Sequence, residues 1–255
     1  MNKYLTMSVD DGHPQDLRMA EMLGNFNVKA TFYIPIKNPE RNLMKDSEIQ
    51  SISEHFEIGG HTYNHRPLDK ITKTMMEKEV VDGKDSMEQL LGKQVISFCY
   101  PRGKFNDTVI DVVKNAGFVG ARTCMYFLHD FPKNPYRWGV STHAHYHSMI
   151  IQIRHALLER NFRGVLNFFK IQKGTLDWVD QFKLVADYVE RNGGIAHLYL
   201  HSWEIDQADE WNKLEGLLNY LTVKNNLKRV TNGDLFKLSI GVSKSESEKK
   251  GNRSI

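Results

Sequence analysis

Two aspartates stand side by side in the segment SVDDGHPQD, residues 8 to 16, directly after an apolar run. Neighbouring side chains of a strand point to opposite faces, so Asp10 and Asp11 can converge on one site only if the chain bends there. Gly12 makes such a bend easy. The alternative is a turn or a helix N-cap, in which one carboxylate accepts from the backbone of the following helix.

Two histidines four positions apart lie in HTYNH, residues 61 to 65. On a helix His61 and His65 would share one face and could bind one metal ion, although capping or surface histidines show the same spacing. The preceding glycines favour a loop after a strand. A catalytic zinc site takes a third ligand, often a carboxylate, and keeps a position open for water. The aspartate pair could supply that ligand.

A carboxylate pair beside a cation could divide the work of hydrolysis. One carboxylate would bind the ion, and the other would take a proton from water whose pKa the ion lowers from 15.7 to about 7. The leaving amine then needs an acid. His201 ends the apolar run IAHLYL, where a strand-end catalytic residue is expected, although a lone histidine is more often a core or surface residue.

Two further features lie near these motifs. His143, His145 and His147 alternate in HAHYH, on one face of a predicted strand. They could form a second metal site, but no carboxylate or cysteine accompanies them, so we favour a place in the substrate groove or the core. Trp203 follows LHS and could pack against a sugar ring or simply against its neighbours.

The pattern along the chain predicts an α/β protein that positions these residues at strand ends. Apolar runs and helical periodicities alternate, which indicates a mostly parallel sheet, either a barrel or a doubly wound layer. The predicted strands are 3–9, 28–36, 57–62, 95–100, 118–123 and the run IAHLYLH at 195–201. The predicted helices are 14–26, 72–92, 106–117, two between 148 and 173, and one from 175 to the double glycine at 193–194.

Length and composition limit the classes of protein. The chain has 255 residues, which predicts one domain over residues 1–240 and a disordered tail over 241–255. The net charge of +3 gives no reason to expect nucleic acid binding. Two cysteines and the lack of a secretory signal favour the cytoplasm. No apolar run is long enough for a transmembrane helix, but the basic, amphipathic stretch 148–173 leaves peripheral membrane contact open.

Three motifs in this order resemble a known family. SVDDG is similar to TFDDG, HTYNH fits H-[ST]-x-x-H, and LYLH fits L-x-x-H. Over residues 3–235 the chain therefore resembles the polysaccharide deacetylases of the NodB homology group, carbohydrate esterase family 4. The resemblance implies a distorted (β/α) barrel with about seven mostly parallel strands.

The same resemblance assigns roles to five residues. Asp10 would be the catalytic base and His201 the general acid. The metal ligands would be Asp11, His61 and His65. The ion would be divalent, with zinc the first choice and cobalt, manganese, nickel or iron as alternatives.

The third motif of the family departs from its pattern. R-x-P-x-G here reads CYPRG, so Cys99 replaces the arginine that holds the catalytic aspartate. Arg102 is one candidate for the missing charge. Tyr100, Arg102, Gly103 and Trp203 are predicted to bind substrate, and the backbone after Pro101 is a candidate oxyanion donor.

The fourth motif, D-x-x-D-W, is absent from its expected place. PYRWG keeps only Trp138, and LDWVD at 176–180 is better interpreted as a helix start. The partner that orients His201 is therefore missing from the pattern. Glu204, three residues after His201, is the candidate for that role.

The leading hypothesis is a cytoplasmic, metal-dependent hydrolase that acts on carbon–nitrogen bonds other than peptide bonds. It would remove an N-acetyl or other acyl group from an amino sugar, on a nucleotide- or lipid-linked precursor of a surface polysaccharide. One alternative is an amidase or deformylase acting on another small amide. The other is a non-catalytic carbohydrate-binding relative. The sequence leaves the sugar and the oligomeric state open.

Overall fold

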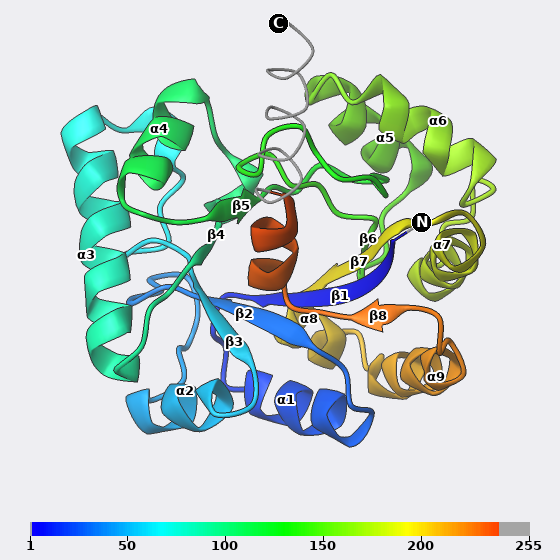
Figure 1. The fold of residues 1–255 in the computed structure, drawn as a ribbon, viewed down its shortest axis with the longest axis horizontal. Helices are drawn as coiled ribbons and strands as arrows, with labels where there is room; N and C mark the ends of the chain where they lie inside the picture. Colours follow the sequence, from blue (N-terminus) through cyan, green and yellow to red (C-terminus); the bar gives the residue numbers. More distant parts are fainter. Residues whose placement is uncertain (1, 240–255) are drawn as a thin grey trace, which may run out of the picture.

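The sheet is built outward from its first strand. In the computed structural model, which describes residues 2–239, β1 (Lys3–Asp10) lies inside a sheet with the order β5-β4-β3-β2-β1-β7-β6 (Figure 1). All of these strands pair in parallel, and the short β8 (Lys228–Arg229) pairs with the start of β1. The strands curl into a half-barrel with helices outside. The predicted distorted (β/α) barrel with about seven mostly parallel strands is confirmed.

The remaining elements follow in chain order. The strands are β2 (Ala30–Ile34), β3 (Glu57–Gly60), β4 (Ser97–Cys99), β5 (Gly120–Arg122), β6 (Thr142–His143) and β7 (Gly194–Leu200). The longer helices are α1 (Asp16–Asn25), α2 (Asp46–Ser53), α3 (Lys73–Leu91), α4 (Asp107–Asn115), α5 (Met149–Leu158), α6 (Phe162–Lys170), α7 (Trp178–Asn192) and α9 (Trp211–Thr222). The short helices are η1 (Leu68–Lys70), η2 (Pro101–Gly103) and α8 (Ser202–Gln207), and residues 232–239 are also helical.

Most predicted elements are found within a few residues of their expected ends. HTYNH is not a helix, since the chain leaves β3 at Gly60 and runs through a loop. Only His143 of HAHYH belongs to a strand, so the three histidines do not share a strand face. The start of α7 is capped by the side chain of Asp177, in agreement with the interpretation of LDWVD. The predicted tail, 241–255, lies outside the described residues.

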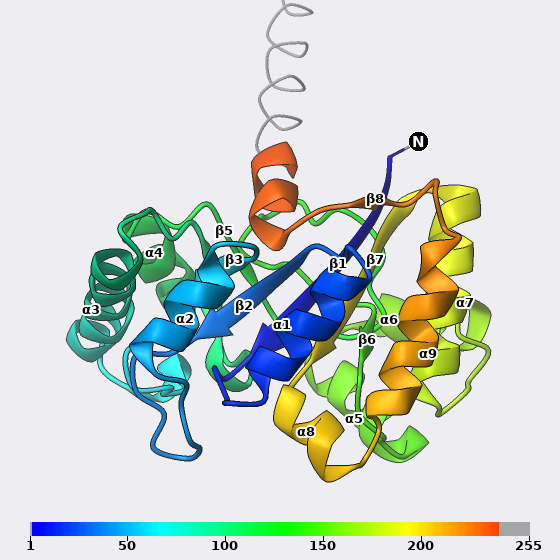
Figure 2. The ribbon, with the colours of Figure 1, turned by 90° about the horizontal axis from the view of Figure 1, so that it is seen from below.

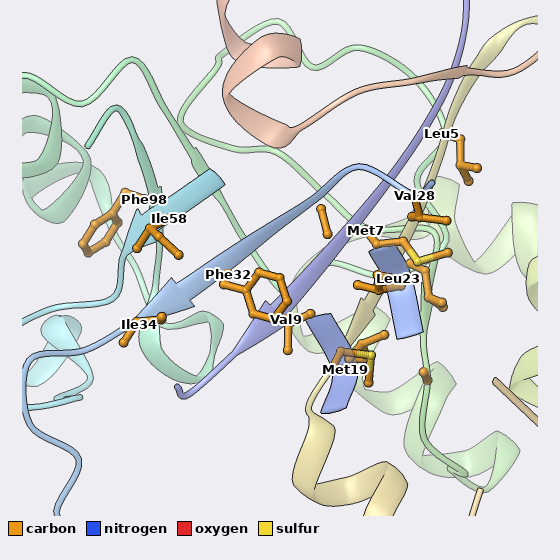
Figure 3. Close-up of a cluster of buried hydrophobic side chains, with 14 of the residues drawn as sticks. Leu5, Met7, Val9, Met19, Leu23, Val28, Phe32, Ile34, Ile58 and Phe98 are labelled. Carbon is orange, nitrogen blue, oxygen red and sulfur yellow. The ribbon is translucent and has the colours of Figure 1, made fainter. Parts of the chain in front are cut away.

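The outer face of the sheet is apolar and packs against the helices. Leu5, Met7 and Val9 alternate along β1 and therefore share one face (Figure 3). They belong to the same buried cluster as Met19 and Leu23 of α1. This burial of apolar surface is the main force that fixes helices on the sheet.

The inner face of the same strand is polar although it is equally buried. Thr6, Ser8 and Asp10 alternate with the apolar residues, and all three are buried. Ser8 Oγ lies 2.9 Å from His197 Nε2 on β7, and Thr6 donates to Asn232 at 2.9 Å. The interior of the half-barrel is thus lined with hydrogen-bonding groups, and Asp10 points into it.

The parallel arrangement brings the carboxyl ends of the strands to one edge. Figure 2 shows α8, which follows β7, near the edge toward which β2 points. Asp10, Cys99 and Arg122 are the last residues of their strands, while His61 and His201 come directly after theirs. Ligands of α/β proteins gather at this edge. None of the helices within residues 2–239 combines the length and the apolar character needed to cross a bilayer.

Candidate active site

The two aspartates part at a sharp bend. Asp10 ends β1, Asp11 has a left-handed φ of 83°, and Gly12 follows with a φ of 66°. A Cβ on Gly12 would lie 2.7 Å from Cγ2 of Ile34, so both the space and the conformation require glycine. The predicted bend is present, and it turns the two carboxylates in different directions.

Asp11 meets both histidines of the loop after β3. Its Oδ1 lies 3.1 Å from His65 Nε2 and 3.7 Å from His61 Nε2. All three side chains are buried, and one ligand atom from each lies within 4.8 Å of the others. The loop is strained, because Thr62 and His65 have φ values of 67° and 55°. The structure therefore brings together the three residues predicted as metal ligands.

The donor set fits a divalent cation. His61 Nδ1 lies 2.8 Å from the carbonyl oxygen of Cys99. Because a carbonyl only accepts, Nδ1 carries the proton and the lone pair of Nε2 is left facing Asp11. Burial raises the pKa of Asp11, but the imidazoles of His61, His65 and His201 beside the carboxylate outweigh it and hold the pKa well below its ordinary value. One carboxylate and two imidazoles suit zinc and similar ions.

Asp10 is held from inside the barrel by Arg122, which ends β5. Arg122 is fully buried, and its Nη2 forms an ion pair with Asp10 Oδ2. The same nitrogen lies 2.8 Å from Cys99 Sγ, which in turn lies 3.4 Å from Asp10 Oδ2. Cys99 pairs with Arg122 across β4 and β5, so both side chains enter the barrel at one level. Arg122, and not Arg102, thus supplies the charge that holds Asp10.

The second carboxylate oxygen of Asp10, Oδ1, is able to accept a proton. Within residues 2–239, Oδ1 is buried and has no hydrogen-bond partner. Ligand atoms of Asp10 and His61 lie within 4.8 Å of each other, so the carboxylate borders the triad of Asp11, His61 and His65. Burial raises the pKa of the Cys99 thiol well above its ordinary value, so this thiol keeps its proton and can donate it to Asp10 in a hydrogen bond.

His201 approaches Asp11 from the end of β7. Its Nε2 lies 3.7 Å from Asp11 Oδ2 and 3.0 Å from the hydroxyl of Tyr199, and its Nδ1 lies 2.7 Å from Glu204 Oε2. Burial lowers the pKa of His201, but the bond to Glu204 and the charge of Asp11 outweigh burial and raise it to about 9. Glu204 therefore lies where a partner of His201 was expected.

Two histidines of the HAHYH segment form a chain of hydrogen bonds that ends at Glu204. His143 Nε2 lies 2.9 Å from Glu204 Oε2, and His143 Nδ1 lies 3.0 Å from His147 Nε2. Since a carboxylate only accepts, His143 donates through Nε2 and accepts from His147 through Nδ1. Burial lowers the pKa of His143. His145 is half-buried, with Nδ1 3.9 Å from Glu204 Oε1. These bonds occupy both ring nitrogens of His143.

Tyr100 does not line an open groove, contrary to expectation. Its side chain is fully buried, its hydroxyl donates to the carbonyl oxygen of Tyr136 at 3.0 Å, and its ring stacks on Phe105. Tyr100 directly follows Cys99, whose side chain points into the barrel, so Tyr100 points to the opposite, apolar face.

The other two residues of this turn lie nearer to the site. The side chain of Arg102 is exposed and forms an ion pair with Glu40, whose Oε2 is 3.9 Å from His65 Nδ1. Arg102 itself has a φ of 56°. A Cβ on Gly103 would lie 2.7 Å from Cβ of Cys124, so this glycine is required by packing.

Trp203 borders the site, but its ring is partly covered. Its Nε1 donates to Asp11 Oδ2 at 3.0 Å. The guanidinium carbon of Arg41 lies 3.2 Å from the ring centroid, and Arg41 Nε lies 3.8 Å from Asp11 Oδ2. Arg41 was missed in the sequence because it belongs to a loop without a motif. A sugar ring could stack on this face of Trp203 only after Arg41 moves.

Comparison with known proteins supports the family resemblance. Residues 1–121 match the family model described as polysaccharide deacetylase. The matched part contains Asp10, Asp11, His61 and His65, together with the CYPRG turn. The resemblance is thereby confirmed through its first two motifs, whereas LYLH at 198–201 lies beyond the matched residues.

Individual relatives extend this comparison. A peptidoglycan-N-acetylglucosamine deacetylase of Bacillus cereus is 29% identical over 136 residues, which are 52% of this chain and 60% of that enzyme. The chain thus spans less than two thirds of the length of this curated relative. A Mycobacterium smegmatis structure assigned to the polysaccharide deacetylases has a TM-score of 0.67 at 14% identity and covers 95% of this chain and 92% of its own. The Xyl-CE4 domain of a xylanase from the hindgut metagenome of Trinervitermes trinervoides has a TM-score of 0.58 at 15% identity, covering 93% and 91%.

Proposed function

We propose that the protein is a metal-dependent hydrolase that removes the N-acetyl or another acyl group from an amino sugar, because residues 1–121 match the polysaccharide deacetylase family model. The substrate would be a nucleotide- or lipid-linked precursor of a surface polysaccharide. The observation that carries this proposal is the meeting of Asp10, Asp11 and His201 with His61 and His65 at one edge of the sheet. Residues 1–240 would form the single catalytic domain.

Asp11, His61 and His65 would hold the divalent ion, with zinc as the first choice. When bound there, such an ion lowers the pKa of water and polarises the acyl carbonyl group. The loop after β3 prepares its part of the site, since His61 is already fixed in the required tautomer by the carbonyl of Cys99.

Asp10 would act as the general base. Its Oδ2 is occupied by Arg122 and Cys99, which fix the plane of the carboxylate. Its Oδ1 is left to accept a proton from the attacking water, and the positive charge of Arg122 balances the carboxylate inside the barrel. The N–H group of Arg102, which follows Pro101, is our candidate donor to the developing oxyanion.

His201 would act as the general acid. Its pKa of about 9 keeps the imidazole protonated at neutral pH, so it can deliver a proton to the leaving amine. Glu204 fixes the ring through Nδ1, and Nε2 is the nitrogen on the side of Asp11. We further propose a cytoplasmic location, supported by two free cysteines, Cys99 and Cys124.

Release of acetate tests the proposal. The full chain, loaded with zinc or cobalt, should release acetate from at least one N-acetylated amino sugar in a panel that includes nucleotide-linked and lipid-linked forms. Asp10→Asn should reduce the rate by about 100- to 10,000-fold, because a general base is lost. The metal content of this variant should equal that of the wild type.

Two outcomes would contradict this assignment. Full activity of Asp10→Asn would remove Asp10 from the base role. Activity on small cyclic or formyl amides, with none on any acetylated sugar, would favour the amidase alternative, for which the cover of Arg41 on Trp203 is the supporting observation.

A further inference from the structure

Helices α5 and α6 expose an apolar surface that the catalytic proposal does not use. Large side chains of both helices are open to solvent: Ile150 is 78% exposed, Leu158 72% and Phe162 64%. Ile150, Leu157 and Leu158 are spaced seven and eight residues apart on α5, while Phe162, Leu166 and Phe169 follow at i, i+4 and i+7 on α6. Both helices therefore turn an apolar stripe outward.

The buried faces of the two helices are already in use. Gln152 and Ala156 are the buried residues of α5, and Gly164 and Phe168 those of α6. Asn161, between the helices, donates to the carbonyl of residue 126 at 2.7 Å. The pair is thus anchored to the body through its inner side, and Figure 1 draws both helices at the periphery, beside α7. The outer stripe is a surface feature of a packed unit.

Positive charge surrounds this stripe. Five basic side chains of residues 149–173 are exposed: Arg154, Arg160, Arg163, Lys170 and Lys173. Of these five side chains, only Arg163 forms an ion pair with an acidic residue of the described chain, 2–239. Its partner is Asp130, at 2.6 Å. Glu159 is the single acidic residue of the segment, and burial raises its pKa to about 8. The surface therefore carries an almost unbalanced positive charge.

We propose that the outer surface of α5 and α6 docks on an anionic membrane. An apolar stripe with aliphatic and phenylalanine side chains can enter the boundary of acyl chains and headgroups, and the surrounding basic residues can meet lipid phosphates. A second copy of this chain fits less well. A two-fold interface through the stripe would bring each basic rim against itself, because the same patch faces its symmetry mate.

Docking would place the active site one helix layer behind the headgroups, on the inner side of α5. Gln152 of α5 donates to the carbonyl of His147 at 2.7 Å, and His147 is bonded to His143, the partner of Glu204. If the proposed function holds, this position favours a lipid-linked amino sugar over a nucleotide-linked one. That consequence rests on the proposed function, whereas docking itself does not.

Vesicle sedimentation tests docking without any activity. The full chain should sediment with vesicles of equimolar phosphatidylcholine and phosphatidylglycerol, should bind vesicles of phosphatidylcholine alone more weakly, and should be released by high salt. The double variant Ile150→Asp and Leu158→Asp should bind at least about tenfold more weakly, because two exposed apolar side chains are lost. Val223→Asp is the matched control. Val223 follows α9, outside α5 and α6, and is 70% exposed, so this variant should bind like the wild type.

A second variant separates charge from apolar contact. Arg154→Gln with Lys170→Gln should weaken binding to the anionic vesicles alone, and circular dichroism should show native helix content for every variant. If the wild type does not sediment with the anionic vesicles, the proposal is overturned. Equal binding by the Ile150→Asp, Leu158→Asp variant would also overturn it, as would a dimer of the wild type that this variant abolishes.

Discussion

The base side and the acid side of the site are held in different ways. Asp10 is fixed by a fully buried guanidinium and a thiol inside the barrel. His201 is fixed by Glu204, which is itself fixed by His143, in a partly buried chain of hydrogen bonds at the rim. The first arrangement depends on one buried charge pair, and the second spreads the same task over several weaker contacts.

The difference predicts how each side responds to substitution. Loss of one partner of a buried ion pair leaves the other charge without compensation in a low dielectric, which is costly for the whole fold. Loss of one member of a hydrogen-bond chain at the rim leaves groups that water can still reach. Substitutions around Asp10 should therefore lower the free energy of unfolding. Substitutions around His201 should instead change the rate and its pH dependence by smaller steps.

The largest effect is expected at Arg122. Arg122→Gln should lower the free energy of unfolding by about 3–5 kcal/mol, since Asp10 stays buried without its cation. Urea denaturation of the full chain measures this change. The control is Arg102→Gln, which removes an exposed pair with Glu40 and should cost about 1 kcal/mol or less. Equal stability of the two variants would show that the buried pair does not hold the base side together.

An intermediate effect is expected at Glu204. Glu204→Gln should reduce kcat by about ten- to a hundredfold, the usual loss when an orienting partner is removed. The pKa of His201, about 9 with Glu204 present, should fall toward its ordinary value. Because the protonated form is the acid, the rate falls as pH rises through this pKa, and in the variant the fall should begin at a lower pH. An alkaline limb at the wild-type position would contradict the role of Glu204.

The smallest effect is expected at His143. His143→Leu removes a buried donor to Glu204, and loss of one hydrogen bond of about 1 kcal/mol corresponds to about a fivefold change in kcat. The alkaline limb should shift in the same direction as in Glu204→Gln, but less. His145→Leu is the matched control, because His145 Nδ1 lies 3.9 Å from Glu204 Oε1, too far for a hydrogen bond. If both variants behave alike, the chain behind Glu204 has no part in orienting the acid.

The residues that the sequence revealed come from contiguous motifs. Asp10 and Asp11 share one bend, and His61 and His65 share one loop, so a few letters specify each pair. The parallel sheet then needs only strand-end placement to bring the motifs together. The same reasoning identified Glu204, since it lies one helical turn after His201.

The supporting residues could not be found in this way, because strand register places them. Arg122 reaches Asp10 only because it pairs with Cys99 across β4 and β5. Its one available signal was a charged residue at the end of an otherwise apolar strand. Register also explains why Tyr100 was wrongly predicted to bind substrate. Tyr100 is one residue after Cys99, so its side chain points to the opposite face of the sheet. His143 was assigned to a strand with its neighbours, but β6 ends at His143.

Metal binding by matched variants tests the central claim most directly. After dialysis against zinc, the wild type and Asp10→Asn should each retain one ion per chain, as measured by elemental analysis of the full-length protein. Asp11→Asn should lose stoichiometric binding, because the charged ligand of the triad is gone while its shape remains. Zinc retained by Asp11→Asn at the wild-type level, or lost from Asp10→Asn, would contradict the division of roles between the two aspartates.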